Sequence, residues 1–374
     1  MIRFILLCSI FCISCAEIRN NLGLTWNHGL ASLGFVSAQA KMGDFYFDST
    51  DSPHSTDEAL KWYRLAAKQG HEHSQERLGY IYIYGIGVER DVSKGLKWYR
   101  MAGDQGYDKA QLSLGDIYSY GDVLPENMGE ALRWYRKAAE QGNPGAQVSL
   151  GDKYSFGQGV VKDPDKAFQW YKKAADQGHA HGQMNLATMH YLGTGVEKNE
   201  AEGFKWYMRA AAQGESDAQF EVAEAYLFGD GVDKNSEEAI KWYLKSVTED
   251  SPMGWVKIGD MYADGLGITK DEVEAVKYYK KVAEKGYEIG MVKLGDMYAN
   301  GRGIEKDLLK AISLYREAAK NDSGEAQLRL GRLYVIGQGV NKDKDKALDL
   351  FRKAADQDVE AALKELEKYK NHIP

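Results

Sequence analysis

The stretch AQLSLGDIYSYGDVLPENMGEALRWYRKAAEQ, residues 110–141, is one copy of a unit that recurs along the chain. A small residue returns every 36 residues, each time after an apolar residue, and an aromatic residue keeps the same step. Nine copies without an insertion indicate a repeat array, in which each unit packs on its neighbours and no internal domain boundary is expected. The small residues are Gly43, Gly79, Gly115, Gly151, Ala187, Ala223, Gly259, Gly295 and Gly331, and the aromatic residues are Tyr63, Tyr99, Tyr135, Tyr171, Tyr207, Tyr243, Tyr279, Tyr315 and Phe351.

Each unit is predicted to form two helices. In the quoted copy, Ala110, Leu114 and Tyr118 are spaced by four residues, which predicts a helix over 108–120 with one buried stripe. A Gly-x-Gly turn ends this helix in seven units. The second helix starts at a column of preferred N-cap residues, and a Glu three residues later completes a capping box in five units. The N-cap column is Ser55, Asp91, Asn127, Asp163, Asn199, Asn235, Asp271, Asp307 and Asp343, and the Glu residues are Glu58, Glu130, Glu202, Glu238 and Glu274.

The periodicity continues beyond the nine units, which occupy residues 35–358. Trp26 and Leu30 fall 36 residues before Trp62 and Ala66, so residues 17–34 are predicted to form half a repeat, a single helix. Residues 359–374 are rich in Lys and Glu, as a terminal capping helix requires, because no further helix packs on it.

The charge pattern argues against nucleic acid as a partner. Charged residues make up 28% of the chain, and the formal net charge is −7. Lys and Arg are spread evenly over the units, whereas phosphate backbones need a clustered basic face.

The first sixteen residues have the pattern of a secretory signal. Arg3 is followed by an apolar run over residues 4–13, too short to span a bilayer, and then by Ser14, Cys15 and Ala16 as a cleavage site. Removal of this segment leaves a chain without a thiol, and therefore without any possible disulfide. Cleavage after Ala16 is the preferred interpretation. The alternatives are a lipid anchor at Cys15, as in an outer-membrane lipoprotein, and a buried N-terminal helix.

The pattern A-x-x-x-L-G-x-x-Y-x-x-G-x-G-V-x-x-D-x-x-K-A-x-x-W-Y-x-K-A-A-x-Q-G resembles the Sel1-like repeat family, which is related to the tetratricopeptide repeats. It stands almost whole in residues 146–178 and recurs in register over residues 35–358. The resemblance implies an all-α fold, a right-handed superhelical solenoid of antiparallel helix pairs with a concave inner face. It implies no catalytic motif and no cofactor, because members of the family act as binding scaffolds.

Exported bacterial members of this family resemble envelope adaptors or virulence factors that engage host proteins, including during host-cell entry. A cysteine-rich branch, for which β-lactam binding has been proposed, carries a disulfide in each repeat. The mature chain has no cysteine, so this activity is not expected here.

Metal, nucleotide and catalytic sites are not expected either. A nucleotide-binding glycine loop needs a strand before it and a helix that begins at the glycines, whereas here a helix is predicted to end at them. His71 with His73, and His179 with His181, each offer two ligands where a structural zinc needs four. An exposed turn is the preferred interpretation of both pairs.

The predicted concave face carries two columns of candidate binding residues. The residue that directly follows the small residue is acidic in six of nine units. The residue five positions after the small residue is aromatic in several units. Aromatic side chains beside carboxylates are typical of a protein-binding surface. In the alternative, these side chains fold back over the turn glycines and cover the core. The residues predicted to bind are Tyr80, Tyr84, Asp116, Tyr120, Asp152, Phe156, Glu224, Phe228, Asp260 and Asp296.

We therefore predict an exported, monomeric and non-enzymatic scaffold in the periplasm or the extracellular medium. Its expected partner is a protein or an extended peptide of basic or mixed charge, from the same cell or from a host, and no transmembrane span is expected. The alternatives are an envelope adaptor or spacer and, from a different class, a hydrolase acting on cell-wall or β-lactam substrates.

Overall fold

The computed structural model describes residues 27–49, 53–249 and 251–370. These residues form helices joined by turns, without a strand among them, so the predicted all-α fold is confirmed. The predicted signal segment and Cys15 lie outside the described residues. Of the predicted helix over 17–34, residues 27–34 are described; residues 27–32 are helical, and Leu33 and Gly34 form a turn.

The helices fall into two compact units. The division lies at the last turn of the helix that ends at Leu192 and in the turn that follows it. Because helix pairs in a repeat array contact only their neighbours, a long array can divide into such units without any change in its repeat pattern.

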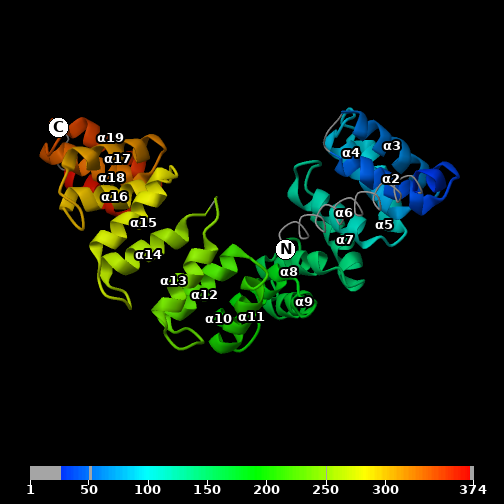
Figure 1. The fold of residues 1–374 in the computed structure, drawn as a ribbon, viewed down its shortest axis with the longest axis horizontal. Coiled ribbons are helices and arrows are strands. Elements are labelled where there is room, and N and C mark those ends of the chain that lie inside the picture. The colour runs from blue at the N-terminus through cyan, green and yellow to red at the C-terminus, as the bar shows by residue number, and fades with distance from the viewer. Residues whose placement is uncertain (1–26, 50–52, 250, 371–374) are drawn as a thin grey trace, which may run out of the picture. The chain divides into compact units, whose positions relative to one another are not determined.

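In the first unit, consecutive helices pack as pairs, α4 with α5, α6 with α7 and α8 with α9 (Figure 1). The helix predicted over 108–120 is confirmed as α6. The helices are α2 Val36–Asp48, α3 Pro53–Lys68, α4 Glu72–Tyr84, α5 Val92–Asp104, α6 Asp108–Tyr120, α7 Met128–Glu140, α8 Pro144–Phe156, α9 Pro164–Asp176 and α10 Ala180–Leu192.

The second unit continues the same pairing, α12 with α13, α14 with α15, α16 with α17 and α18 with α19. The last helix, α20, lies in the segment predicted as a cap and packs on α19. The helices are α11 Glu200–Ala211, α12 Ser216–Phe228, α13 Ser236–Ser246, α14 Met253–Asp264, α15 Glu272–Glu284, α16 Glu288–Asn300, α17 Leu308–Lys320, α18 Gly324–Ile336, α19 Lys344–Ala355 and α20 Glu360–Lys370.

The recurring glycine lets the two helices of a pair approach closely. A Cβ atom on Gly79, Gly259 or Gly295 would lie 2.5–2.7 Å from the tyrosine ring of the following helix. Such a distance is well inside the van der Waals contact of two carbon atoms, about 3.5–4.0 Å. The ring itself is buried, as at Tyr135 and Tyr243. The 36-residue step of glycine and tyrosine is therefore a packing requirement between paired helices.

The second helix of each pair begins at the predicted N-cap in eight units. The side chain of the N-cap residue accepts a hydrogen bond from the backbone N–H three residues later, for example Asn127 Oδ1 from Glu130 at 3.1 Å. The prediction for Ser55 is wrong, because α3 begins at Pro53. Proline is favoured in the first turn of a helix, since it has no N–H to leave unsatisfied, and it moves this start toward the N-terminus.

The second half of the predicted capping box is also wrong. The backbone N–H of the N-cap residue donates to a carbonyl of the preceding helix, as from Asn127 to Tyr118 at 2.8 Å. Each of the five Glu residues instead pairs with a Lys or Arg three residues later, as Glu130 does with Arg133 at 2.9 Å. The backbone bond connects the two helices of a pair. The Glu carboxylate is not needed for that bond and forms its ion pair at the surface.

We expect Asn127→Ala to lower the free energy of unfolding by about 1 kcal/mol, because the N–H of Glu130 loses its acceptor. Urea denaturation measures the loss. Glu130→Gln is the matched control and should change stability by less than about 0.5 kcal/mol, since it removes only an exposed ion pair. Equal losses in the two variants would show that the N-cap is not the source of the stability.

Buried glutamines connect successive pairs of helices. Gln111 donates to the carbonyl of Gly103 at 2.8 Å, and its own side-chain oxygen accepts from Gln141 at 2.6 Å. The same two bonds recur one repeat earlier and one repeat later. These side chains satisfy buried polar groups, and their step is the step of the repeat.

Candidate protein-binding face

The aromatic residues predicted to face the groove end the first helix of their pair. Tyr84, Tyr120 and Phe156 are the last residues of α4, α6 and α8, and Phe228 is the last residue of α12. The glycine that follows each of them has a positive φ, so the chain turns away immediately after the aromatic residue.

These aromatic side chains are exposed. The exposed fraction is 56% for Tyr84, 66% for Tyr120, 70% for Phe156 and 49% for Phe228. Side chains that cover the core would be largely buried, so these fractions argue against the alternative that they fold back over the turn glycines. Tyr80 is less exposed and lies beside Tyr84, with ring centroids 4.9 Å apart. We call Tyr80, Tyr84, Tyr120 and Phe156 the aromatic face; all four lie in the first unit.

Part of the aromatic face surrounds a cavity of about 440 Å³. The cavity brings together Tyr80, Tyr84, Asp116 and Tyr120 of the predicted set. Phe156 and Asp152 do not line it, and neither do the predicted residues of the second unit. Its lining residues are Glu76, Arg77, Tyr80, Tyr84, Tyr99, Ser113, Asp116, Ile117, Tyr120, Asp122 and Val123.

The predicted acidic column has a structural role that the sequence analysis did not foresee. In six units the carboxylate accepts a hydrogen bond from the tyrosine of the next helix, nineteen residues later. The bond fastens the two helices of a pair above the glycine contact. The acceptors and donors are Asp44 and Tyr63 at 2.8 Å, Asp116 and Tyr135 at 2.8 Å, Asp152 and Tyr171 at 2.6 Å, Glu224 and Tyr243, Asp260 and Tyr279 at 2.6 Å, and Asp296 and Tyr315 at 2.6 Å.

In the second unit, each of these carboxylates also has an internal cation. Lys257 lies 2.9 Å from Glu224, Lys293 lies 2.8 Å from Asp260, and Arg329 lies 3.1 Å from Asp296. The carboxylates predicted to attract a basic partner are therefore already neutralised within this unit. Whether they contact a partner as well stays a prediction.

In the first unit, the carboxylates differ in their environment. Burial raises the pKa of Asp116 and of Asp152, although the hydrogen bonds from Tyr135 and Tyr171 and the charge of Lys153 oppose the shift. Burial also acts on Asp44, but the hydrogen bonds from His73 and Tyr63 outweigh it, and the pKa of Asp44 is lowered. The environment of Asp116 and Asp152 thus favours the charged carboxylate less than the environment of Asp44 does.

We expect Tyr135→Phe to destabilise the chain more than Tyr279→Phe. The first change leaves Asp116, a half-buried carboxylate, without the phenol donor and should cost about 1–3 kcal/mol. After the second change Asp260 keeps Lys293 at 2.8 Å, so the cost should be about 1 kcal/mol or less. Urea denaturation of the two variants measures the difference, and a larger loss for Tyr279→Phe would contradict this assignment of roles.

Glu76 is a residue of the cavity that the sequence analysis missed. It is largely buried, and burial raises its pKa, although the charges of Arg77 and His73 oppose the shift. Its equivalents one to three repeats later are Leu112, Val148 and Met184. A carboxylate in an otherwise apolar column was the signal in the sequence that pointed to it.

The two histidine pairs belong to the helix starts. The Nδ1 atom of His71 accepts from the backbone N–H of Ser74, and His179 accepts from Gly182 in the same way, each at 3.3 Å. His71 and His179 are thus N-cap residues. Within the described ranges, no three His, Cys, Asp or Glu side chains are grouped as a metal site would require.

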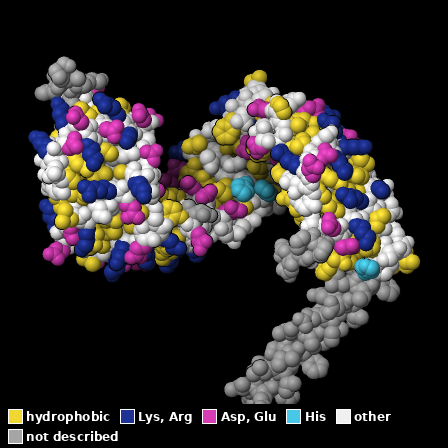
Figure 2. All heavy atoms as spheres, turned by 90° about the horizontal axis from the view of Figure 1, so that it is seen from above, with side chains coloured by type: hydrophobic (Ala, Val, Ile, Leu, Met, Phe, Trp, Pro, Cys, Tyr) yellow, Lys and Arg dark blue, Asp and Glu magenta, His cyan; other side chains and the backbone are white. Residues whose placement is uncertain are grey.

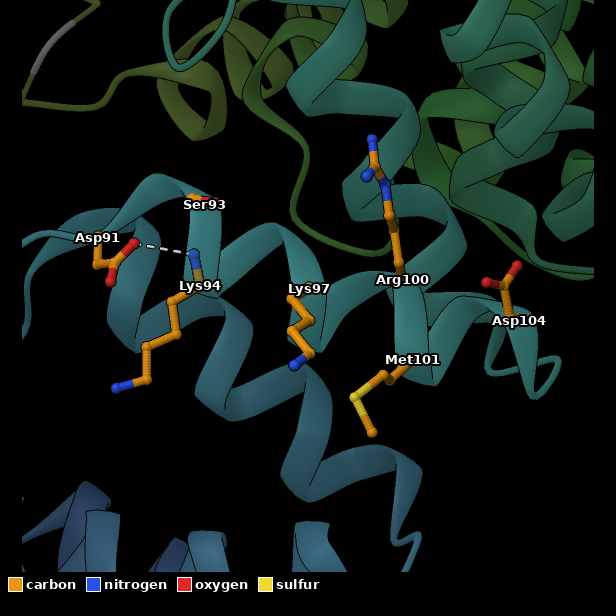
Figure 3. A pocket seen from close by; sticks show the side chains of 7 residues that line it. All are labelled: Asp91, Ser93, Lys94, Lys97, Arg100, Met101 and Asp104. Carbon is orange, nitrogen blue, oxygen red and sulfur yellow. Dashed lines mark hydrogen bonds between the residues drawn. The ribbon is translucent and has the colours of Figure 1, made fainter.

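Two further cavities carry no comparable set of residues. One, of about 650 Å³, is lined by Asp91, the N-cap of α5, and by residues of α5 alone. Figure 3 shows Arg100 pointing away from Lys94 and Lys97, so the three cations do not converge on one point. The other, of about 790 Å³, contains Arg329, which already pairs with Asp296 and Glu325.

The surface seen in Figure 2 mixes acidic and basic side chains, without a broad area of a single sign. A basic stripe, which nucleic acid would need, is not seen on this face. Among the residues that the structure covers, no helix has the length and apolar character needed to cross a bilayer.

The spacing of these contacts matches a known repeat. The profile described as Sel1 repeat matches nine consecutive segments, residues 36–71, 73–107, 108–143, 144–179, 180–215, 216–251, 256–287, 289–323 and 324–359. The chain is a Sel1 repeat protein. The resemblance inferred from the glycine, tyrosine and N-cap columns is thereby confirmed. Sel1 repeats mediate protein–protein interaction, and proteins built from them are typically non-enzymatic scaffolds.

Two solved Sel1 repeat structures are similar over most of the chain. One is a protective antigen present in uropathogenic Escherichia coli strains, which displays an SLR fold. It is 30% identical with a TM-score of 0.67, and the match covers 93% of this chain and 82% of that one. The other is a Sel1 repeat protein from Oxalobacter formigenes, 29% identical with a TM-score of 0.65, covering 83% and 91%.

A more distant structure shows the fold alone. It is a STAND protein with a tetratricopeptide repeat sensor from Pyrococcus horikoshii, 17% identical with a TM-score of 0.55, and the match covers 89% of this chain and 54% of that one. No curated protein matches the sequence.

Proposed function

We propose that this Sel1 repeat protein is an exported, non-enzymatic scaffold that holds another protein on its aromatic face. The observation that supports this most directly is the exposure of Tyr84, Tyr120 and Phe156 at the same position of three successive repeats. Large aromatic side chains held at the end of a rigid helix supply contact area at little entropic cost, and they are enriched where proteins bind one another.

Export is part of the proposal. The support is the segment of residues 1–16, with its basic start, short apolar run and small residues before residue 17. The similar protein from uropathogenic Escherichia coli is a protective antigen. We propose that the chain acts in the periplasm, outside the cell or, with a lipid on Cys15, on the outer membrane. A role as a virulence factor that binds a host protein belongs to the same proposal.

Capture of the partner tests this proposal. The purified chain is immobilised and incubated with an envelope extract of the producing cell and, separately, with an extract of host cells. Bound proteins are identified by mass spectrometry and the same capture is repeated with Tyr84, Tyr120 and Phe156 replaced by Ala. We expect at least one protein that the parent retains and the variant loses. Identical sets of proteins would remove the aromatic face from the account and would favour an architectural spacer.

A further inference from the structure

The array pairs a carboxylate of one repeat with a cation of the next, 33 residues later. In the second unit these pairs are Glu224 with Lys257, Asp260 with Lys293, and Asp296 with Arg329. At the end of the array both signs are exchanged, and Arg332 lies 2.9 Å from Glu365. Acid and base change places together, so the two positions face each other as a pair.

Asp116 and Asp152 have no such cation. The residues 33 positions later are Ser149 and Asn185, both neutral. Asn185 reaches Asp152 with a hydrogen bond of 3.4 Å. Within the described part of the chain, no side-chain nitrogen of Lys, Arg or His lies within 4.0 Å of an oxygen of either carboxylate.

One internal cation acts on both carboxylates from a greater distance. Lys153 is 8% exposed, and its Nζ atom donates to Gln158 Oε1 at 2.9 Å. Its charge lowers the pKa of Asp116 and of Asp152, and yet burial keeps both raised. The charge of His181 also lowers the pKa of Asp152. A single lysine therefore leaves these two carboxylates less well compensated than their counterparts in the second unit.

Both carboxylates lie beside exposed aromatic rings. Tyr120 and Phe156 follow Asp116 and Asp152 by four residues in α6 and α8, and residues with this spacing lie on one face of a helix. Asp116 also lines the cavity with Tyr80 and Tyr84. A cation that enters such a site gains from the carboxylate and from the faces of the rings.

We propose that the partner supplies Lys or Arg side chains to Asp116 and Asp152, in the positions that Lys257, Lys293 and Arg329 occupy in the second unit. This inference rests on the proposed function, because it specifies which chemistry the aromatic face recognises. The ligand class is an extended or exposed protein segment with at least one basic residue.

A random dodecapeptide library displayed on phage provides the probe. It is selected on the purified full chain, and synthetic copies of the selected peptides are measured by calorimetry. We expect the selected peptides to be rich in Lys and Arg. Asp116→Asn should weaken their binding about tenfold or more, because a charge-assisted contact is lost. Asp44→Asn is the matched control, since Asp44 lies in the same column outside the predicted binding residues and is already paired with His73 at 2.8 Å. It should change the affinity less than about threefold.

The sharper variant is Ser149→Lys, which removes no side chain of the aromatic face. It gives Asp116 the internal cation that Lys293 gives to Asp260, and it should weaken the binding of basic peptides about tenfold or more. Ser149→Met has a side chain of similar length without the charge, and it should bind as the parent does. Circular dichroism establishes that each variant is folded.

The outcomes separate the two proposals. Selected peptides that lack Lys and Arg but lose affinity when Tyr120 and Phe156 become Ala would overturn this inference and leave the proposed function standing. Equal losses of peptide affinity in Ser149→Lys and Ser149→Met would also overturn this inference, because the size of the new side chain and not its charge would then explain the loss. If no selected peptide loses affinity when Tyr120 or Phe156 is replaced by Ala, the result would contradict both the inference and the proposed function.

Discussion

Gly115→Val is expected to lower the free energy of unfolding by about 3 kcal/mol or more. A Cβ atom at this position overlaps the ring of Tyr135, which is fully buried. The two helices of the pair would have to separate, and the hydrogen bond from Tyr135 to Asp116 would be strained with them. Urea denaturation followed by circular dichroism measures the loss.

Gly129→Val is the matched control, with the same chemical change on the next helix. A Cβ at Gly129 would meet only the side-chain oxygen of Asn127, at an ordinary contact distance of 3.5 Å. We expect the stability to stay within about 0.5 kcal/mol of the parent or to rise, because glycine is the poorer helix former. A parent-like stability of Gly115→Val would show that the close approach of α6 and α7 does not hold the pair together.

The second large effect concerns binding. The triple variant Tyr84→Ala, Tyr120→Ala and Phe156→Ala should weaken partner affinity about 100-fold or more, which corresponds to about 2.7 kcal/mol. The side chains are exposed, so their removal should change the free energy of unfolding by less than about 0.5 kcal/mol for each residue. Calorimetry with the captured partner measures the affinity, and urea denaturation measures the stability.

A double variant of exposed residues on the second helices gives the comparison. Leu65 and Met101 lie on α3 and α5, and they are 40% and 38% exposed. Leu65→Ala with Met101→Ala removes apolar surface away from the aromatic face, and we expect less than about a threefold change in affinity. Similar losses in the triple and the double variant would indicate non-specific adhesion in place of a defined binding face.

The fold was readable from the sequence because each repeated residue has a local cause. Glycine recurs where two helices touch, and Asp or Asn recurs where a helix begins, so both columns can be interpreted without a structure. The start at Ser55 failed for an equally local reason. Pro53 offers a better first-turn residue two positions earlier, and the nine-unit pattern outweighed this single proline.

The hydrogen bonds of the carboxylate column could not be predicted, because their donors are distant in sequence. Asp116 lies on α6, whereas its hydrogen-bond donor, Tyr135, lies on the next helix, nineteen residues later. The sequence contains only part of the signal. The unit that carries Phe351 in place of tyrosine also carries Arg332 in place of the carboxylate, but the units with Tyr80 and Thr188 in this column keep their tyrosines, Tyr99 and Tyr207.

The pairing across repeats carried a similar signal. In the second unit, the three carboxylates of the column, Glu224, Asp260 and Asp296, are each followed 33 residues later by Lys or Arg. The last pair, Arg332 with Glu365, has its signs reversed. Side-chain distances are needed to show that the two columns touch. Once that contact is known, the neutral residues Ser149 and Asn185 indicate that Asp116 and Asp152 receive no cation from the next repeat. The exposure of Tyr120 and Phe156 also depends on packing, which periodicity alone does not determine.

Site-specific photocrosslinking tests the central claim most directly. A photoreactive phenylalanine analogue replaces Tyr120 in one variant and Met101 in another, and each variant is irradiated in the presence of the captured partner. The account predicts a covalent adduct from position 120, at the centre of the aromatic face, and none above background from position 101 on α5. An adduct from position 101 without one from position 120 would contradict it.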